Sequence, residues 1–322
     1  MDLPRLPDHH RIVDLAGVRI ALVADSPARR EALDGHLAPV PDSCGDAQLT
    51  IGFVAEPLAV PLRPADTVDY AVECWLEGDR VHLRHATGLS AVVDGTVLVV
   101  GGESTEPDVA FRHLFQYGVT HLLAPLDAWV LHAGAIGRTG RAALLLGSTG
   151  SGKSTLAYAA LSAGWALLAD DLVVVSTAGT ALRVTGIPKQ VAVPAELLPE
   201  GGHHNGEIDA RNRRPMPAEV IDVSTHELAG LVRVSHGTGR GQLNEVPAAE
   251  ALEDVLWSFP ARTTPTLARG AFELAARLSR LPAVELQHAA GPDIRVRRAG
   301  ELLEEAWASS LLKADSPRDA DQ

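Results

Sequence analysis

A glycine-rich segment between an apolar run and a helical pattern has the composition of a phosphate-binding loop. Residues 147–154 read Gly-Ser-Thr-Gly-Ser-Gly-Lys-Ser, which fits G-x-x-x-x-G-K-[ST] at every fixed position. Glycine lets backbone N–H groups curl inward around phosphate oxygens, where a Cβ would collide or forbid the required φ. The segment therefore predicts a P-loop that binds a nucleoside triphosphate.

The end of this loop carries the side chains that such a site requires. The ammonium of Lys153 would reach the β- and γ-phosphate oxygens, and the hydroxyl of Ser154 would hold Mg²⁺. The helix that follows would direct its positive end at the same phosphates. The expected cofactors are ATP and Mg²⁺. The predicted nucleotide-binding residues are Gly147, Ser148, Thr149, Gly150, Ser151, Gly152, Lys153, Ser154 and Thr155.

The elements that position the loop are predicted to form a small mixed sheet. Ala128–Ile136 and Arg141–Leu146 are apolar runs joined by the turn 137–140, which predicts an antiparallel hairpin. The helix Lys153–Ala163 follows the loop. In a Rossmann-type domain, a crossover helix would instead lead from a parallel strand. The fold class is therefore α/β with a mixed-sheet P-loop domain.

Three polar residues flank the loop and end or interrupt apolar strands. Asp170 and Asp171 follow the run Ala166–Ala169, and His132 lies within Ala128–Ile136. By themselves, the aspartates could be ordinary turn residues and the histidine an ordinary core residue. Their proximity to a P-loop favours a catalytic interpretation.

Taken together, these residues resemble the core of the bacterial HPr serine kinase/phosphorylase family, whose nucleotide site is shared with ATP-dependent PEP carboxykinases. The resemblance is carried by Leu-His-Ala-Gly around His132, by the P-loop, and by Leu-Leu-Ala-Asp-Asp-Leu around Asp170 and Asp171. It is close over residues 126–176 and looser to about residue 310. It implies a P-loop domain of the HPr kinase C-terminal type.

The resemblance also implies a role for each matching residue. Asp171 would be the general base that takes the proton from the acceptor hydroxyl. Asp170 would lie beside the metal and the γ-phosphate, so that Ser154 and Asp170 are the candidate metal ligands. His132 would orient the carboxylate of Asp171 or donate a hydrogen bond to the phosphoryl group. The candidate catalytic residues are Asp171, His132, Lys153 and Asp170.

The implied activity is transfer of the γ-phosphoryl group of ATP to a hydroxyl, above all a serine of a protein or precursor peptide. Three alternatives stay open. The acceptor could be a small-molecule alcohol, or the chain could be a nucleotide-binding regulatory protein with little or no transferase activity. A carboxykinase-like enzyme with a carboxylate substrate is disfavoured, because the sequence shows no arginine or metal-ligand set for a dicarboxylate beyond the shared core.

Two features of the family are missing from this sequence. The stretch Val184–Val193 contains no counterpart of the family's downstream acidic metal ligand, and no arginine-bearing loop for the reverse, phosphorylase reaction is recognisable. We therefore expect no reversal of the phosphorylation. The sequence is more similar to divergent members found in peptide natural-product pathways, such as those of lasso peptides. Proteins of the HPr kinase type often form hexamers, so a homo-oligomer stays open.

Several polar residues outside this core are weaker candidates. Arg211, Arg213 and Arg214 could clamp an anionic substrate, although a solvated basic turn is the simpler interpretation. Lys189 could contact phosphate or be an ordinary surface lysine. We interpret His203 and His204 as loop residues, because no further ligands stand at metal spacing.

The chain is predicted to contain two domains. Residues 1–104 would form an N-terminal β-rich α+β domain with one early helix and two hairpins, which could bind a substrate or partner. Residues 105–312 would form the kinase domain, and 313–322 a polar, disordered tail. The hairpins are predicted at Tyr70–Glu77 with Arg80–His85, and at Val92–Val93 with Thr96–Val100.

Composition excludes several classes of partner. The net charge of −13 over 322 residues disfavours general nucleic-acid binding. No apolar run approaches the ~20 residues that a membrane helix needs, and the first residues lack a signal-peptide pattern. Cys44 and Cys74 form neither a CxxC motif nor a zinc pattern, which is typical of a reducing compartment. We therefore expect a cytoplasmic protein with no membrane or nucleic-acid partner.

Overall fold

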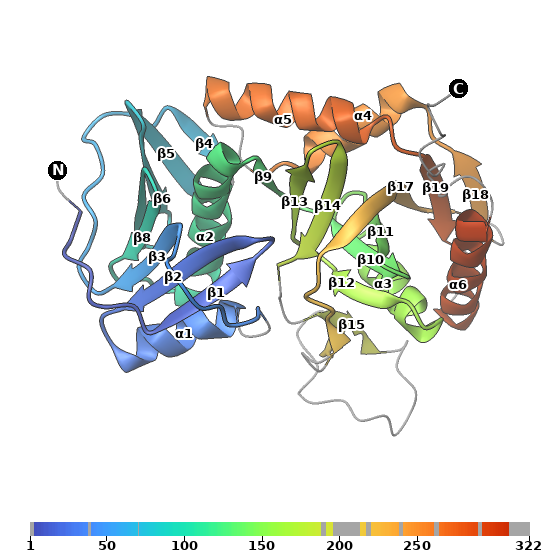
Figure 1. Ribbon diagram of the computed structural model, residues 1–322, viewed down its shortest axis with the longest axis horizontal. Helices are drawn as coiled ribbons and strands as arrows, with labels where there is room; N and C mark the ends of the chain where they lie inside the picture. The colour runs from blue at the N-terminus through green and yellow to red at the C-terminus, as the bar shows by residue number, and fades with distance from the viewer. Residues whose placement is uncertain are drawn as a thin grey trace. The chain divides into compact units, whose positions relative to one another are not determined.

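The computed structural model describes residues 3–37, 40–69, 71–187, 191–195, 213–216, 220–237, 241–260, 264–288 and 292–308. Over these ranges the chain has mixed α/β structure and divides into two compact units (Figure 1). Unit 1 comprises Met1–Val130 and Pro260–Ala271, and unit 2 comprises Leu131–Phe259 and Phe272–Gln322. In the described part of the chain, no helix has both the length and the apolar character needed to cross a membrane.

Unit 1 is built on one mixed sheet of eight strands. Three of them, β2, β3 and β8, are parallel neighbours, and the remaining pairs are antiparallel. The strand order is β1 (Arg11–Leu15), β2 (Val18–Ala24), β3 (Leu49–Val54), β8 (Val97–Gly101), β7 (Ser90–Asp94), β6 (Arg80–His85), β5 (Val72–Glu77) and β4 (Thr67–Asp69). The two predicted hairpins are confirmed as β5–β6 and β7–β8.

Two helices cover one face of this sheet (Figure 1). Helix α1 (Pro27–Leu37) connects the parallel strands β2 and β3, and α2 (Pro107–Leu123) packs on β6, β7 and β8. The helices meet where the ring of His36 stacks on that of Phe111 at 4.7 Å between centroids. Apolar residues that recur at helical spacing predict this helix from the sequence, and all of them except Val109 are buried.

The boundary between the units differs from the predicted one at 104/105. Because α2 is buried against β6, β7 and β8, it belongs to unit 1, and the division falls at Val130 and Leu131. Strand β9 (Ala128–Leu131) and helix α5 (Pro265–Leu278) both span a boundary between the units. Gly101 and Gly102, which suggest a break in the sequence, are the end of β8 and the start of a short loop.

Unit 2 contains a second mixed sheet, centred on two parallel strands. Strand β11 (Arg141–Leu146) pairs in parallel with β17 (His226–His236), and antiparallel with β10 (Gly134–Arg138). The other edge of β17 pairs with β14 (Ala181–Gly186) at its start and with β19 (Ala283–His288) at its end. Further along the sheet, β12 (Ala166–Ala169) pairs with β10, β13 (Val173–Ala178) with β14, and β18 (Gln242–Glu245) with β19.

The predicted hairpin ahead of the P-loop is confirmed by the pairing of β10 with β11. The register ends at Arg138 and Arg141, so Thr139 and Gly140 form a two-residue turn. Both residues have positive φ, 51° and 78°, as a type I′ hairpin turn requires.

The single predicted strand over residues 128–136 is wrong, because the chain leaves the strand between β9 and β10. The peptide N–H of His132 donates to the carbonyl of Ser258 at 2.6 Å rather than to a ladder partner. The residues on both sides are buried and apolar, so the hydrophobic run alone gave no sign of the interruption.

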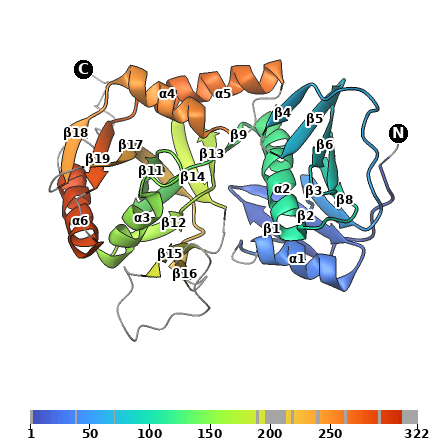
Figure 2. The same ribbon diagram turned by 180° about the vertical axis from the view of Figure 1, so that it is seen from behind.

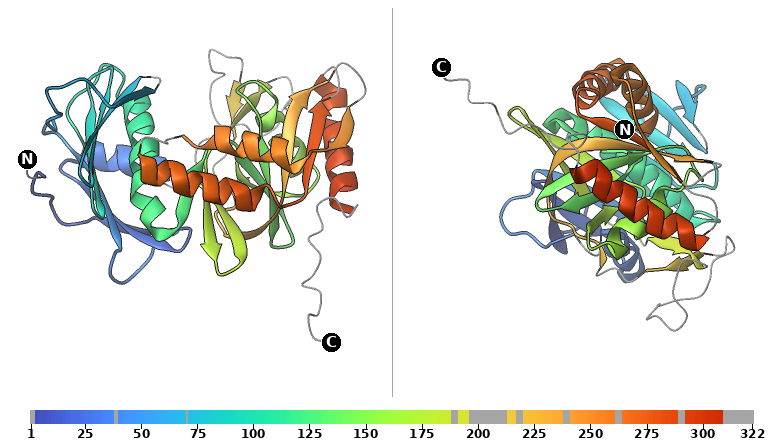
Figure 3. Two further views of the ribbon diagram at one scale, coloured as in Figure 1. Left: turned by 90° about the horizontal axis from the view of Figure 1, so that it is seen from above. Right: turned by 90° about the vertical axis from the view of Figure 1, so that its right-hand side faces the viewer.

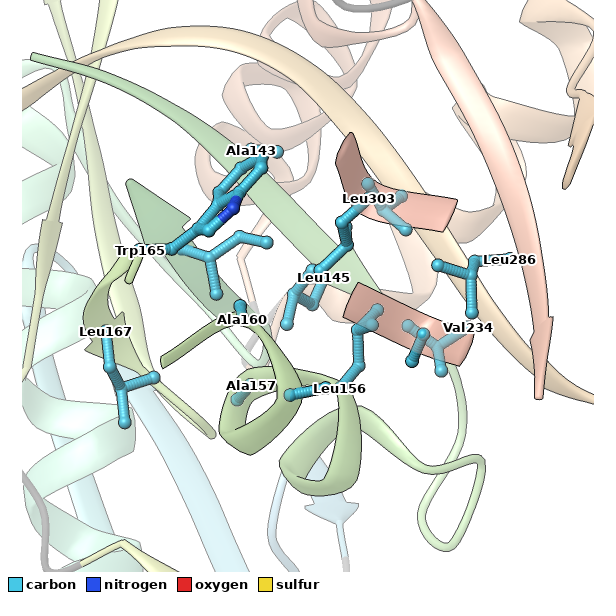
Figure 4. Close-up of a cluster of buried hydrophobic side chains, with 14 of the residues drawn as sticks. Ala143, Leu145, Leu156, Ala157, Ala160, Trp165, Leu167, Val234, Leu286 and Leu303 are labelled. Atoms are coloured by element: carbon cyan, nitrogen blue, oxygen red, sulfur yellow. The ribbon is translucent and has the colours of Figure 1, made fainter. Parts of the chain in front are cut away.

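The core of unit 2 lies between the sheet and two helices, α3 (Lys153–Ser162) and α6 (Pro292–Ala308), which contact each other (Figure 2). In the right-hand view of Figure 3, α6 (red) lies across this face of the sheet. Figure 4 shows Leu145, Leu156 and Leu303 pointing into the cluster. The cluster anchors α3 and therefore the loop that precedes it. Other members labelled in the figure are Ala143, Ala157, Ala160, Trp165, Leu167, Val234 and Leu286.

Apolar residues at helical spacing predict two further helices, over residues 250–257 and 301–311. The structure has α4 (Ala248–Ser258) and α6, which begins nine residues before its predicted start. Two short strands, β15 (Ala192–Pro194) and β16 (Arg213–Pro215), pair with each other. Lys189, Arg211, His203, His204 and the tail 313–322 lie outside the described residues.

Glycine 118 determines how closely α2 approaches the sheet of unit 1. A Cβ at this position would lie 2.5 Å from Cδ1 of the fully buried Leu98. We predict that Gly118→Ala lowers the free energy of unfolding by about 1–3 kcal/mol through overpacking. Gly35→Ala in α1 is the matched control, because its Cβ would meet no atom within 4 Å. It should raise stability by up to about 1 kcal/mol. Urea unfolding measures both, and two changes of the same sign would contradict this packing.

The buried His121 on α2 should make stability depend on pH. Burial lowers the pKa of His121 from 6.5 to about 4. The unfolded chain therefore takes up a proton that the folded state resists, so stability is full above pH 6.5 and declines as the pH falls toward 4. The free energy of unfolding should fall by about 3 kcal/mol between pH 7 and pH 4. Unfolding measured at pH 7 and pH 5 should show a smaller loss in His121→Gln than in the parent; equal losses would refute the assignment.

Candidate active site

The P-loop lies between the end of β11 and the start of α3, as the sequence predicts. Three of its glycines have positive φ: 147° at Gly147, 83° at Gly150 and 103° at Gly152. A side chain rarely adopts these values, which explains the glycine spacing of the motif. The first helical hydrogen bond runs from the N–H of Leu156 to the carbonyl of Gly152. The N–H groups of residues 153–155 precede it and belong to the donors that a helix start leaves for an anion.

The interior of the loop leaves no room for a side chain at Gly147. A Cβ there would lie 2.6 Å from Oγ of Ser151 and 2.7 Å from the carbonyl oxygen of Val234 in β17. The hydroxyl of Ser151 is buried, and among the described residues it has no hydrogen-bond partner. An unpartnered buried hydroxyl in a loop that leads into the start of a helix is the environment expected of a phosphate-binding site.

The side chain of Lys153 folds back over the loop. Its ammonium donates to the carbonyl oxygens of Gly147 at 2.6 Å and Ser148 at 3.2 Å, and the residue is only 8% exposed. Burial lowers the pKa of Lys153, while the charges of Asp171 and Asp170 act in the opposite direction. The two carboxylates are therefore within electrostatic range of the ammonium at the mouth of the loop.

The two aspartates after β12 each face a different partner. The hydroxyl of Ser154, in the first turn of α3, lies 3.4 Å from Oδ2 of Asp170. This hydroxyl–carboxylate pair has the oxygen ligands that Mg²⁺ takes in nucleotide sites, where phosphate oxygens and water complete the shell. The residues present thus fit a Mg–nucleotide complex, in which Ser154 and Asp170 would bind the metal.

Asp171 forms the second pair, with His132. Nε2 of His132 lies 3.2 Å from Oδ1 of Asp171, and the side chains are 42% and 25% exposed. The break between β9 and β10 makes this contact available, because it turns residue 132 out of the strand, and the bond from its N–H to Ser258 fixes the backbone there. An imidazole at this distance from a carboxylate limits the orientations that the carboxylate can take, as a general base requires.

The structure thus brings Lys153, Ser154, Asp170, Asp171 and His132 together at one end of the sheet in unit 2. Of the weaker candidates, Arg213 and Arg214 fall in β16, where only the backbone is described.

Sequence analysis missed two histidines that contact the loop. Nε2 of His236, at the end of β17, lies 2.6 Å from the carbonyl oxygen of Gly150. Nε2 of His288, at the end of β19, lies 3.0 Å from the carbonyl oxygen of Gly152. The apolar residues over 229–234 predict a strand that ends just before His236, and this position at the carboxyl end of a strand was the one signal available in the sequence.

No protein-family model matches the chain, and no curated protein matches it. Among solved structures, it is similar to the HPr(Ser) kinase/phosphatase from Coxiella burnetii, with a TM-score of 0.28 and 11% sequence identity. The similarity covers 55% of this chain and 95% of that chain. At this TM-score it carries no argument, and the interpretation of the site rests on the residues of this chain.

Substitution of Gly147 tests whether this loop is the phosphate site. Because the added Cβ would meet a backbone carbonyl of β17 that has little freedom to move, Gly147→Ala should distort the loop and weaken binding of Mg–AMP-PNP at least ~30-fold, about 2 kcal/mol. The measurement is isothermal titration calorimetry. The control is Gly164→Ala, which follows the other end of α3 with φ of 83° and open space. It also places a side chain at a positive φ, and it should leave affinity within about 3-fold of wild type. Equal affinities of the two variants would place the phosphates elsewhere.

Proposed function

We propose that this chain is a Mg-ATP-dependent kinase that transfers the γ-phosphoryl group to a hydroxyl, with a serine of a protein or peptide as the preferred acceptor. The observation that carries the proposal is the contact of 3.2 Å between His132 and Asp171 beside a complete P-loop. A P-loop alone would support only a bound nucleotide. A carboxylate oriented by an imidazole at the loop's mouth adds the base that an acceptor hydroxyl needs.

The proposed roles follow from the contacts of each side chain. Lys153 neutralises phosphate charge from its position over the loop, since its ammonium already interacts with two loop carbonyls. Ser154 and Asp170 would supply oxygen ligands to Mg²⁺. Mg²⁺ bound there would neutralise charge that develops on the phosphates. Asp171 accepts the proton of the acceptor hydroxyl, and His132 keeps its carboxylate turned toward the acceptor.

The energetic requirement supports this division of labour. Phosphoryl transfer depends mainly on positioning and on charge neutralisation, and it needs little covalent chemistry from the protein. Lys153, Ser154 and the backbone donors of the loop lie at the start of α3. The buried apolar cluster under α3 anchors this helix. A rigid scaffold of this kind suits a reaction in which misplacement by 1 Å can cost about 100-fold in rate.

The decisive experiment is label transfer from γ-labelled ATP to serine-containing peptides and to small alcohols, with Asp171→Asn as the variant. Removing the base should reduce transfer at least ~100-fold and leave the affinity for Mg–AMP-PNP within about 3-fold of wild type. The control is Asp222→Asn. Asp222 also contacts a histidine, His226, at 3.0 Å, but His226 stands at the opposite end of β17 from the P-loop.

Three outcomes distinguish the candidate functions. Label on a peptide serine that Asp171→Asn abolishes supports the proposal, and label on an alcohol alone moves the acceptor class to small molecules. Nucleotide binding with no transfer to either class identifies a regulatory protein. Undiminished transfer by Asp171→Asn would refute the role given to this carboxylate.

A further inference from the structure

The two histidines that contact the P-loop stand side by side at the ends of neighbouring strands. His236 ends β17 and His288 ends β19, and the parallel register places them opposite each other. Their ring centroids are 6.1 Å apart, with the planes tilted by 41°. Because β11 runs parallel to β17 and leads directly into the loop, the strand ends bring both rings to it.

Each ring contacts a different peptide group of the loop. His236 reaches the carbonyl of Gly150 and His288 that of Gly152, so the two contacts lie on either side of Ser151. A carbonyl oxygen only accepts hydrogen bonds, and therefore Nε2 must carry a proton in both rings. The contacts fix the tautomer of each histidine as well as the orientation of the loop.

A held carbonyl also orients the N–H on the other side of the same peptide bond. The described chain contains no cis peptide bonds, so the N–H of Lys153 points away from the carbonyl of Gly152. That carbonyl accepts hydrogen bonds from His288 and from the N–H of Leu156 in α3, so the N–H of Lys153 points out of the start of the helix, where phosphate oxygens would bind. The histidine thus acts on the anion site through one peptide plane.

The ring of His288 is packed tightly against the loop. The residue is 1% exposed, and a Cβ on Gly152 would lie 2.4 Å from its Nε2. His236 is exposed and contacts the loop from the outside. The inner ring should therefore contribute more than the outer one, because a buried imidazole that loses its hydrogen-bond partner cannot bond to water instead.

We propose that His236 and His288 are positioning residues that hold the P-loop in its anion-binding conformation and thereby set the affinity for the triphosphate. This inference rests on the proposed function, in which the loop binds Mg-ATP. Neither histidine touches the reacting atoms; both act through the peptide groups of Gly150 and Gly152.

The test is the dissociation constant of Mg–AMP-PNP for the full chain, measured by calorimetry, in paired variants. His288→Phe keeps a ring and removes the donor, whereas His288→Gln keeps an N–H donor at similar reach. We expect binding to weaken ~10-fold or more in His288→Phe and to return within about 3-fold of wild type in His288→Gln. His236→Phe should weaken binding ~2–5-fold, and His236→Gln should restore it.

The matched control is His226→Phe. His226 is a buried histidine on the same strand β17, but it bonds Asp222 and Ser224 at the end away from the loop. Its loss should lower thermal stability without changing affinity. In the transfer assay, the His288 variants should raise KM for ATP with kcat nearly unchanged, a split that general destabilisation would not produce.

The results separate this inference from the proposed function. If wild type binds Mg–AMP-PNP and both phenylalanine variants bind it within 2-fold of wild type, the positioning role is refuted and the kinase proposal stands. If His288→Phe does not fold, His236→Phe decides: a ~2–5-fold weakening that His236→Gln restores supports the role, and binding within 2-fold of wild type refutes it. If wild type binds no nucleotide, both proposals fail together.

Discussion

The site depends on one constraint: the backbone between β11 and α3 must turn its N–H groups inward within a few residues. Gly147 meets it because any side chain there would collide with Ser151 and with the carbonyl of Val234. The ends of β17 and β19 support this turn, and the apolar cluster under α3 anchors the helix that follows it. This turn also places Lys153 and Ser154, because they begin the helix that follows it.

The strand pairings around β10 explain where the other catalytic candidates lie. A short antiparallel hairpin, rather than a crossover helix, leads into β11, so the segment just before β10 lies at the same end of the sheet as the loop. His132 occupies that segment, and β12, which pairs with β10, ends beside it at Asp170 and Asp171. The mixed sheet thus brings the histidine and both aspartates to the end of the sheet where the loop lies, through short connections.

Local features of this chain were predictable from the sequence and distant ones were not. The glycine pattern, the turn at Thr139 and Gly140, and the helix after the loop are each encoded within about ten residues. The break at His132 depends on a hydrogen bond to Ser258, and the support of the loop depends on His236 and His288. These contacts arise from strand pairing between segments far apart in the chain, which composition and periodicity do not report. The boundary after α2 was missed for the same reason, because tertiary packing decides to which unit a helix belongs.

Amide hydrogen exchange with and without Mg²⁺ and AMP-PNP tests the central claim most directly, because it reports on the loop without requiring a known acceptor. If Gly147–Thr155 form a phosphate-binding loop supported by the ends of β17 and β19, the nucleotide should slow exchange most in peptides that contain residues 147–156. Smaller protection should appear around His236 and His288. Nucleotide binding that leaves exchange at 147–156 unchanged and protects another segment would contradict the account.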